Sequence, residues 1–188
     1  MDCTEGISLL EDVHLSGWLR NVIAQQGCVM IEKYYTKVKD FGMEFEAMAD
    51  GSIRYSGLSL FNTANGAYTG NILATEQRKR ELISRYVTLD CIDNVKEDIC
   101  CLLPQIIDGR YKGPLGVDMM VINDDGSSLA ANEASNGKRI LHPCVEINLR
   151  RTMGHVALTL SPSDDDLVRV MRVVYDSSHY RIKIQRMK

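Results

Sequence analysis

Two apolar segments of this chain carry acidic residues where a fully buried strand would have none. Residues 116–122 contain Asp118, and residues 144–150 contain Glu146, Asn148 and Arg150. Because strand side chains alternate between two faces, Glu146, Asn148 and Arg150 are predicted to share one face. If the segments pair as antiparallel neighbours, two carboxylates, an amide oxygen and a guanidinium converge on one patch. Hard cations bind oxygen ligands and arginine binds phosphate, so this set predicts a magnesium–phosphate site.

A structural explanation of the same pattern also exists. An antiparallel sheet can bury one face and expose the other, and the acidic residues would then be solvated surface positions. The alternation by itself does not separate this explanation from a binding site.

Composition places the chain among globular proteins. It has 188 residues, of which 45% are hydrophobic and 25% charged, with a formal net charge of -3. The lysines and arginines are scattered along the sequence without a basic stripe, which argues against a nucleic-acid partner. No apolar run reaches the ~18 residues of a membrane span, and the first residues lack the pattern of a signal peptide. These properties predict a cytoplasmic protein with no membrane partner.

The cysteines and histidines do not form a recognisable site. The six cysteines show no Cys-x-x-Cys spacing, so neither a zinc site nor a disulfide framework is predicted. Cys144 adjoins Glu146 but has no evident base to activate it as a nucleophile. His142 and His155 flank the acidic strand and are interpreted as packing groups rather than ligands.

Hydrophobic periodicity and turn residues predict the order of the elements. Helices are expected at residues 8–25, 75–85, 93–107, 153–160 and 166–174. Strands are expected at residues 28–31, 40–49, 52–61, 116–122, 144–150 and 180–184. Asp50-Gly51 predicts a hairpin, whereas the polar residues 62–71 are expected to form a loop. This order predicts an α+β fold with a mostly antiparallel sheet and helices packed on its outer face.

Four of these features together, in this order, resemble the ATP-grasp superfamily over about residues 18–160. They are the strand that ends Ile31-Glu32-Lys33-Tyr34, the hairpin that bears Glu44, the Asp118 strand and the string Glu146-Ile147-Asn148-Leu149-Arg150. The run from residue 40 to residue 155 is similar to a subgroup of uncharacterised bacterial ATP-grasp proteins. In this superfamily two α+β lobes hold ATP between them, and the enzymes typically join a carboxylic acid to an amine or thiol through an acyl-phosphate.

The resemblance implies roles for particular residues. Asp118, Glu146 and Asn148 match the magnesium ligands of the family, which manganese can also occupy. Arg150 matches an arginine that contacts phosphate and is the candidate catalytic residue. The family's hinge between lobes, which holds the adenine edge of ATP, is matched by Glu32, Lys33 and Tyr34.

The resemblance is also incomplete. Family members carry, before the hinge strand, a lysine on an earlier strand, a phosphate-covering loop and a whole preceding domain, whereas only about 28 residues precede Val29 here. Residues 1–188 are therefore expected to form a single ATP-grasp-like C-terminal domain. The expected partners are a nucleotide, an unknown carboxylate substrate, and either a missing N-terminal domain or a second copy of the chain.

Three functions remain open on this reading. The first is part of an ATP-dependent carboxylate–amine or carboxylate–thiol ligase. The second is a non-catalytic or degenerate module that binds a nucleotide or a partner. The third is a phosphotransferase, which would use the same metal chemistry to deliver the γ-phosphoryl group to a stable acceptor.

Overall fold

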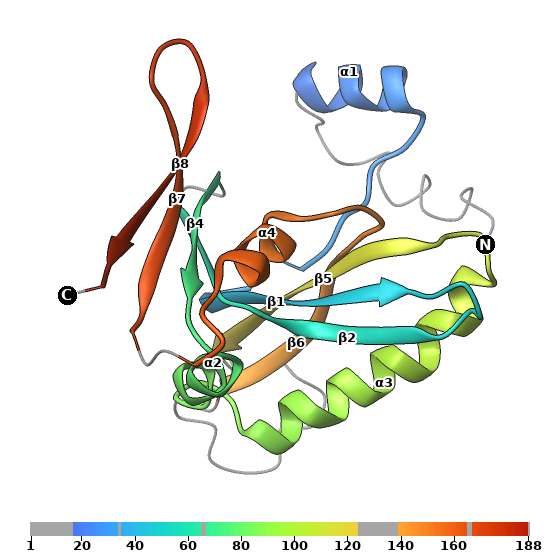
Figure 1. Ribbon diagram of the computed structural model, residues 1–188. Helices are drawn as coiled ribbons and strands as arrows, with labels where there is room; N and C mark the ends of the chain where they lie inside the picture. The colour runs from blue at the N-terminus through green and yellow to red at the C-terminus, as the bar shows by residue number, and fades with distance from the viewer. Residues whose placement is uncertain (1–16, 34, 65–66, 124–138, 165–166, 188) are drawn as a thin grey trace. The chain divides into compact units, whose positions relative to one another are not determined.

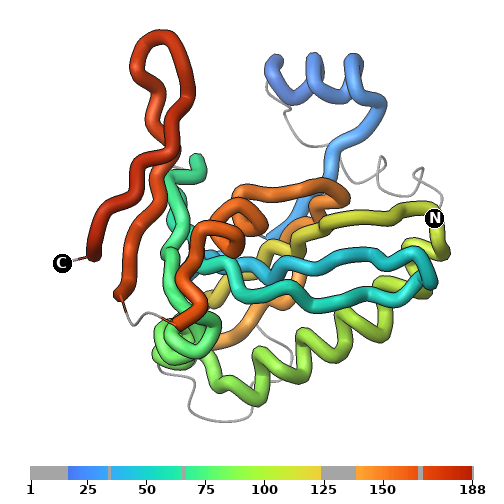
Figure 2. The backbone as a smooth tube through the Cα atoms, in the orientation of Figure 1, coloured from blue at the N-terminus to red at the C-terminus, as the bar shows by residue number. Residues whose placement is uncertain are grey.

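The computed structural model describes residues 17–33, 35–64, 67–123, 139–164 and 167–187. The chain divides into two compact units, Met1–Tyr34 and Tyr35–Lys188. In the first unit the described residues include one helix, α1 (Gly17–Gln26). The second unit contains the two sheets and the remaining helices (Figures 1 and 2).

The first sheet has the strand order β2-β1-β5-β6, and all of its pairs are antiparallel. Its strands are β1 (Lys37–Ala47), β2 (Ile53–Ser59), β5 (Gly113–Asn123) and β6 (Arg139–Asn148). The predicted hairpin joins β1 to β2, where Gly51 has a φ of +86° and the Ser52 hydroxyl and amide both donate to Asp50 Oδ1. The predicted pairing of the two acidic strands is confirmed, with Asp118 opposite Glu146.

One face of this sheet forms the hydrophobic core. Three alternate side chains of β1, Phe41, Met43 and Phe45, are completely buried. They belong to one cluster with residues of β5 and with Ile92 and Leu103 of α3 (Leu89–Ile107), the long helix beneath the sheet in Figure 1. Because side chains alternate, the residues between them on β1 point to the other face, where α4 (Met153–Leu160) lies.

The second sheet has the order β3-β4-β7-β8 and is also antiparallel. Its strands are β3 (Phe61–Ala64), β4 (Ala67–Leu73), β7 (Arg169–Tyr175) and β8 (Tyr180–Arg186). A small second core of Leu73, Ala157 and Met171 joins β4 and β7 to α4. Thr75 caps the N-terminus of the helix α2 (Glu76–Ile83), because its side chain accepts a hydrogen bond from the Arg78 amide. The predicted α+β class and antiparallel pairing are thus confirmed, with two sheets in place of the one expected.

Three sequence-based assignments were wrong. The expected loop at residues 62–71 is the β3–β4 hairpin. The expected helix at residues 166–174 is the strand β7 in its described part, whose Val170, Val173 and Val174 favour strand over helix. The expected buried strand at residues 28–31 has no regular structure, and Met30 and Ile31 are 84% and 67% exposed.

Other boundaries shift without changing the type of element. The predicted strand at residues 144–150 begins at Arg139 and ends at Asn148, and α3 begins at Leu89, where Thr88 caps it. The start of the helix predicted at residues 8–25 lies outside the described residues. In the part of the chain that the structure describes, no helix has the length and apolar character needed to cross a membrane.

Replacing Phe45 by alanine should test the core beneath the site. The ring is completely buried and packs edge-to-face on Tyr55, with 5.6 Å between ring centroids. Phe45→Ala is expected to lower the free energy of unfolding by about 3–5 kcal/mol in a urea titration. Leu102→Ala on the exposed side of α3, where Leu102 is 53% exposed, should change it by less than about 1 kcal/mol. Equal effects of the two substitutions would contradict this description of the core.

Candidate functional site

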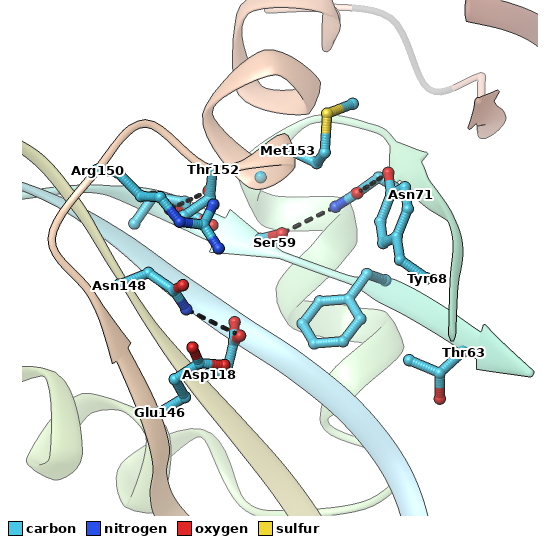
Figure 3. Close-up of a pocket in the computed structure, with 13 residues that line it drawn as sticks. Ser59, Thr63, Tyr68, Asn71, Asp118, Glu146, Asn148, Arg150, Thr152 and Met153 are labelled. Carbon is cyan, nitrogen blue, oxygen red and sulfur yellow. Dashed lines mark hydrogen bonds between the residues drawn. The ribbon is translucent and has the colours of Figure 1, made fainter. Parts of the chain in front are cut away.

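A cavity of about 320 Å³ lies between the first sheet, the β3–β4 hairpin and the start of α4 (Figure 3). One side of it is lined by charged and polar groups that come from β1, β5, β6, the turn after β6 and the start of α4: Glu44, Asp118, Glu146, Asn148, Arg150 and Thr152. The sequence-predicted residues Asp118, Glu146, Asn148 and Arg150 therefore meet in one cavity.

Asp118 and Glu146 face each other because they are direct partners in the β5–β6 register. Burial, followed by the charge of Glu146, raises the pKa of Asp118 to about 6. Asn148 and Arg150 oppose this shift, and the Asn148 amide donates a hydrogen bond to Asp118 Oδ2 over 3.2 Å. The two carboxylates thus carry a repulsion that a cation between them would remove.

The donor set fits a hard divalent cation that brings its own further ligands. In the described ranges, no group of three or more His, Cys, Asp and Glu side chains is arranged to hold a metal ion. On its β5–β6 side the cavity offers the two carboxylates of Asp118 and Glu146 and the amide of Asn148 instead. Magnesium commonly binds through one or two carboxylates together with substrate phosphates, so this partial set suits a metal–phosphate complex better than a free ion. The role of Asp118, Glu146 and Asn148 as metal ligands remains a prediction.

Arg150 reaches the cavity through a tight turn after β6. The strand ends at Asn148, and the Arg150 amide donates to the Asn148 carbonyl over 2.8 Å. Figure 3 shows its guanidinium above the carboxylate pair. Arg151 lines a different cavity, together with Glu46 and His155. The structure thus places only the first of the two adjacent arginines beside the acidic residues.

Glu44 is the site residue that sequence analysis did not select. Its side chain is 3% exposed, and Oε2 accepts a hydrogen bond from the Thr152 hydroxyl over 2.8 Å. Two glycines leave it room: a Cβ on Gly154 would overlap Glu44 Oε1, and one on Gly116 would lie 2.7 Å from Oε2. An acidic residue between buried neighbours on a strand could have indicated that Glu44 belongs to a site. The residues that Glu44 contacts are remote in sequence, so the sequence did not indicate which site.

Glu44 and His155 form a buried pair, with Oε2 and Nδ1 2.8 Å apart. Burial raises the pKa of Glu44 to about 7 and lowers the pKa of His155. Both shifts favour a neutral pair, in which protonated Glu44 donates to Nδ1 and Nε2 of the ring donates to the Phe45 carbonyl over 3.2 Å. The Thr152 amide also points to Nδ1, at 3.3 Å, in agreement with an accepting nitrogen there.

The far wall of the cavity is a neutral hydrogen-bonded group. Asn71 of β4 donates from Nδ2 to Ser59 Oγ over 2.8 Å, and the Tyr68 hydroxyl donates to Asn71 Oδ1. Burial raises the pKa of Tyr68 to about 12, so the phenol stays protonated. Sequence analysis missed this wall because it interpreted residues 62–71 as a loop.

The predicted adenine contacts lie in the other unit of the chain. Glu32 and Lys33 are exposed and belong to the Met1–Tyr34 unit, whereas the cavity is formed entirely by the second unit. Tyr34 lies outside the described residues. The hinge role of these three residues remains a prediction.

No family model and no curated protein matches this sequence. Among solved structures, the chain is similar to an ATP-grasp superfamily protein from Archaeoglobus fulgidus, with 13% identity and a TM-score of 0.41 over 82% of this chain and 47% of that one. It is also similar to N5-carboxyaminoimidazole synthetase from Staphylococcus aureus complexed with ADP, with 15% identity and a TM-score of 0.42 over 76% and 36% of the two chains.

A further structure of the Staphylococcus aureus synthetase gives 13% identity and a TM-score of 0.43, covering 92% of this chain and 49% of that one. This chain therefore spans less than half the length of each of these three structures.

Glu44 should make the metal-free protein less stable as the pH rises. Its pKa is raised from 4.5 to about 7 on folding, so its protonated form stabilises the folded state. This contribution is fully present below pH 4.5 and is lost as the pH rises through about 7. It amounts to at most about 3 kcal/mol. In urea titrations across this range, Glu44→Gln should flatten the decline relative to the parent protein.

Glu46→Gln provides the matched control. Glu46 is two residues away on the same strand, pairs with Arg54 and is far more exposed. Its substitution should change the pH dependence of the free energy of unfolding much less than Glu44→Gln does, because Glu46 enters only as a minor charge that acts on His155. A Glu44→Gln profile that runs parallel to the parent profile would show that Glu44 is already ionised in the folded state.

Proposed function

We propose that the cavity binds the phosphates of a magnesium–nucleotide complex and that the chain forms part of an ATP-dependent ligase. The observation that carries this proposal is the facing pair Asp118 and Glu146, which shares a cavity with Asn148 and Arg150. Two carboxylates alone would attract a cation, and an arginine alone would attract an anion. The presence of the carboxylates and the arginine in one cavity fits a ligand that contains both a cation and an anion.

Each group in the cavity has a distinct part in this proposal. The metal would be held by Asp118, Glu146 and Asn148, and when bound it would neutralise charge on the phosphate oxygens. Arg150, with its delocalised positive charge, would bind the oxygens of the terminal phosphate from the other side. The neutral wall of Ser59, Tyr68 and Asn71 adds hydrogen-bonding groups without adding negative charge near the phosphates.

The sequence resemblance implies a ligase reaction through an acyl-phosphate. The oxygen of a substrate carboxylate would attack the γ-phosphorus, and the bond from that phosphorus to the oxygen of the departing ADP would break. An amine or thiol would then attack the acyl carbon, and inorganic phosphate would leave. Arg150 would stay positively charged throughout and stabilise the transferred phosphoryl group, as expected of catalysis by positioning and electrostatics.

Binding of ATP should depend on the two carboxylates when magnesium is present. In calorimetric titrations, the double variant Asp118→Asn, Glu146→Gln is expected to bind Mg-ATP at least ~10-fold more weakly than the parent chain, because the metal loses its charged ligands. Without magnesium the variant should lose no affinity for ATP, since it no longer repels the phosphates.

The double variant Glu97→Gln, Asp98→Asn is the control for loss of charge. Both residues lie on the exposed side of α3, and neither lines the cavity. This variant should bind Mg-ATP as the parent does. Parent and site variant binding Mg-ATP equally well, or no binding by the parent, would refute a nucleotide site in this cavity.

Arg150→Gln should separate phosphate binding from metal binding. It is expected to lower the affinity for Mg-ATP ~10-fold through loss of charge-assisted hydrogen bonds, with a much smaller effect on Mg-AMP. When the Arg150→Gln variant is titrated with manganese alone and the binding is monitored by electron paramagnetic resonance, it should bind the metal no more weakly than the parent chain does. Equal losses for ATP and AMP would place Arg150 away from the terminal phosphate.

A further inference from the structure

The β7–β8 hairpin concentrates positive charge on a chain whose net charge is -3. From β7 to β8 there is one acidic residue, Asp176, and there are five basic ones: Arg169, Arg172, Arg181, Lys183 and Arg186. Asp176 pairs with Arg181 over 2.5 Å. Within the residues that the structure describes, Arg172, Lys183 and Arg186 form no ion pair. Sequence analysis treated the basic residues as scattered because they are spaced along two strands.

The register of the hairpin sets like charges directly opposite each other. Arg172 pairs with Lys183, and Arg169 pairs with Arg186. Like charges in such positions destabilise a strand pair, and among the described residues neither Arg172 nor Lys183 has an ion-pair partner that would offset this. A bound anion would relieve this repulsion, as a cation would relieve that of Asp118 and Glu146.

Two of these arginines line a cavity of about 560 Å³. Its polar lining also includes Asn62, Thr69 and Gln185, and its apolar lining consists of Val170 and Met187. This volume is within the range of small-molecule sites. The cavity lies on the opposite side of β3 from the Asp118 cavity, because Asn62 lines it while the adjacent Phe61 and Thr63 line the other.

Gly70 on β4 allows the close approach that shapes this cavity. It has a φ of +152°, and a Cβ there would overlap the Met171 carbonyl oxygen and lie 3.2 Å from Arg172 Cγ. The aliphatic part of the Arg172 side chain therefore lies close to the Gly70 backbone, and a side chain at position 70 would displace it. Gly70 itself lines the cavity.

We propose that this cavity is a second ligand site, which binds a small phosphorylated molecule through Arg172 and through Lys183, the direct partner of Arg172 on the same face of the hairpin. Guanidinium groups bind phosphate oxygens in a bidentate manner, and Val170 and Met187 offer an apolar surface to the remainder of such a ligand. A long polyanion such as nucleic acid fits less well, because the net charge of -3 would repel the parts that extend beyond the hairpin. The site goes beyond the proposed nucleotide cavity and shares no lining residue with it.

Calorimetric titration of the full chain with inorganic tripolyphosphate, in the presence of EDTA, tests this proposal. One molecule is expected to bind per chain, and the double variant Arg172→Gln, Lys183→Gln should bind at least ~10-fold more weakly. The control Arg54→Gln, Arg78→Gln also removes two positive charges, but from residues in surface ion pairs with Glu46 and Glu81. It should bind as the parent does.

The variant Asp118→Asn, Glu146→Gln distinguishes this site from the proposed nucleotide cavity. It should retain tripolyphosphate binding in EDTA, whether or not the parent chain binds Mg-ATP. Absence of tripolyphosphate binding, or equal losses in the hairpin and control variants, would overturn the proposal. Single-stranded DNA that binds more tightly than tripolyphosphate and depends on Arg172 and Lys183 would overturn the assignment to a small molecule.

Discussion

The buried carboxyl group of Glu44 fixes how α4 is attached to the first sheet. It meets the Thr152 hydroxyl and the His155 ring, which also form the capping box of that helix. The helix contacts strands of both sheets, β2 and β4 among them. A carboxyl group buried without these partners would cost several kcal/mol, so the helix position and the protonation of Glu44 depend on each other.

Strand β1 supports the core and the cavity with alternate residues. Phe41, Met43 and Phe45 are buried on one face, and Glu44 points to the other. The apolar face supplies the stability that allows carboxyl groups to gather opposite it at raised pKa values. The cavity is therefore built on a strand that is anchored in the hydrophobic core, which suits a site that has to hold several charges at fixed separations.

Local pattern predicted the parts of the site that lie within single strands. The alternation around Glu146 and Asn148 and the turn at Asp50-Gly51 were sufficient to predict the facing acidic strands and the first hairpin. Glu44 was different, because Thr152 is 108 residues away and nothing near Glu44 in sequence indicates that contact. The β3–β4 hairpin was hidden by polar composition, and the run at residues 28–31 could not be told from a buried strand by hydrophobicity alone.

The contact of Glu44 with Gly116 and Gly154 restricts the order in which these three positions can change. A side chain at position 154 would occupy the place of the carboxyl group, and one at position 116 would press on its second oxygen. A smaller residue must therefore replace Glu44 before a larger residue can replace either glycine. Reversion to the present residues would follow the opposite order. What each of the two glycine positions can accept therefore depends on the side chain at position 44, although 110 residues separate that position from Gly154.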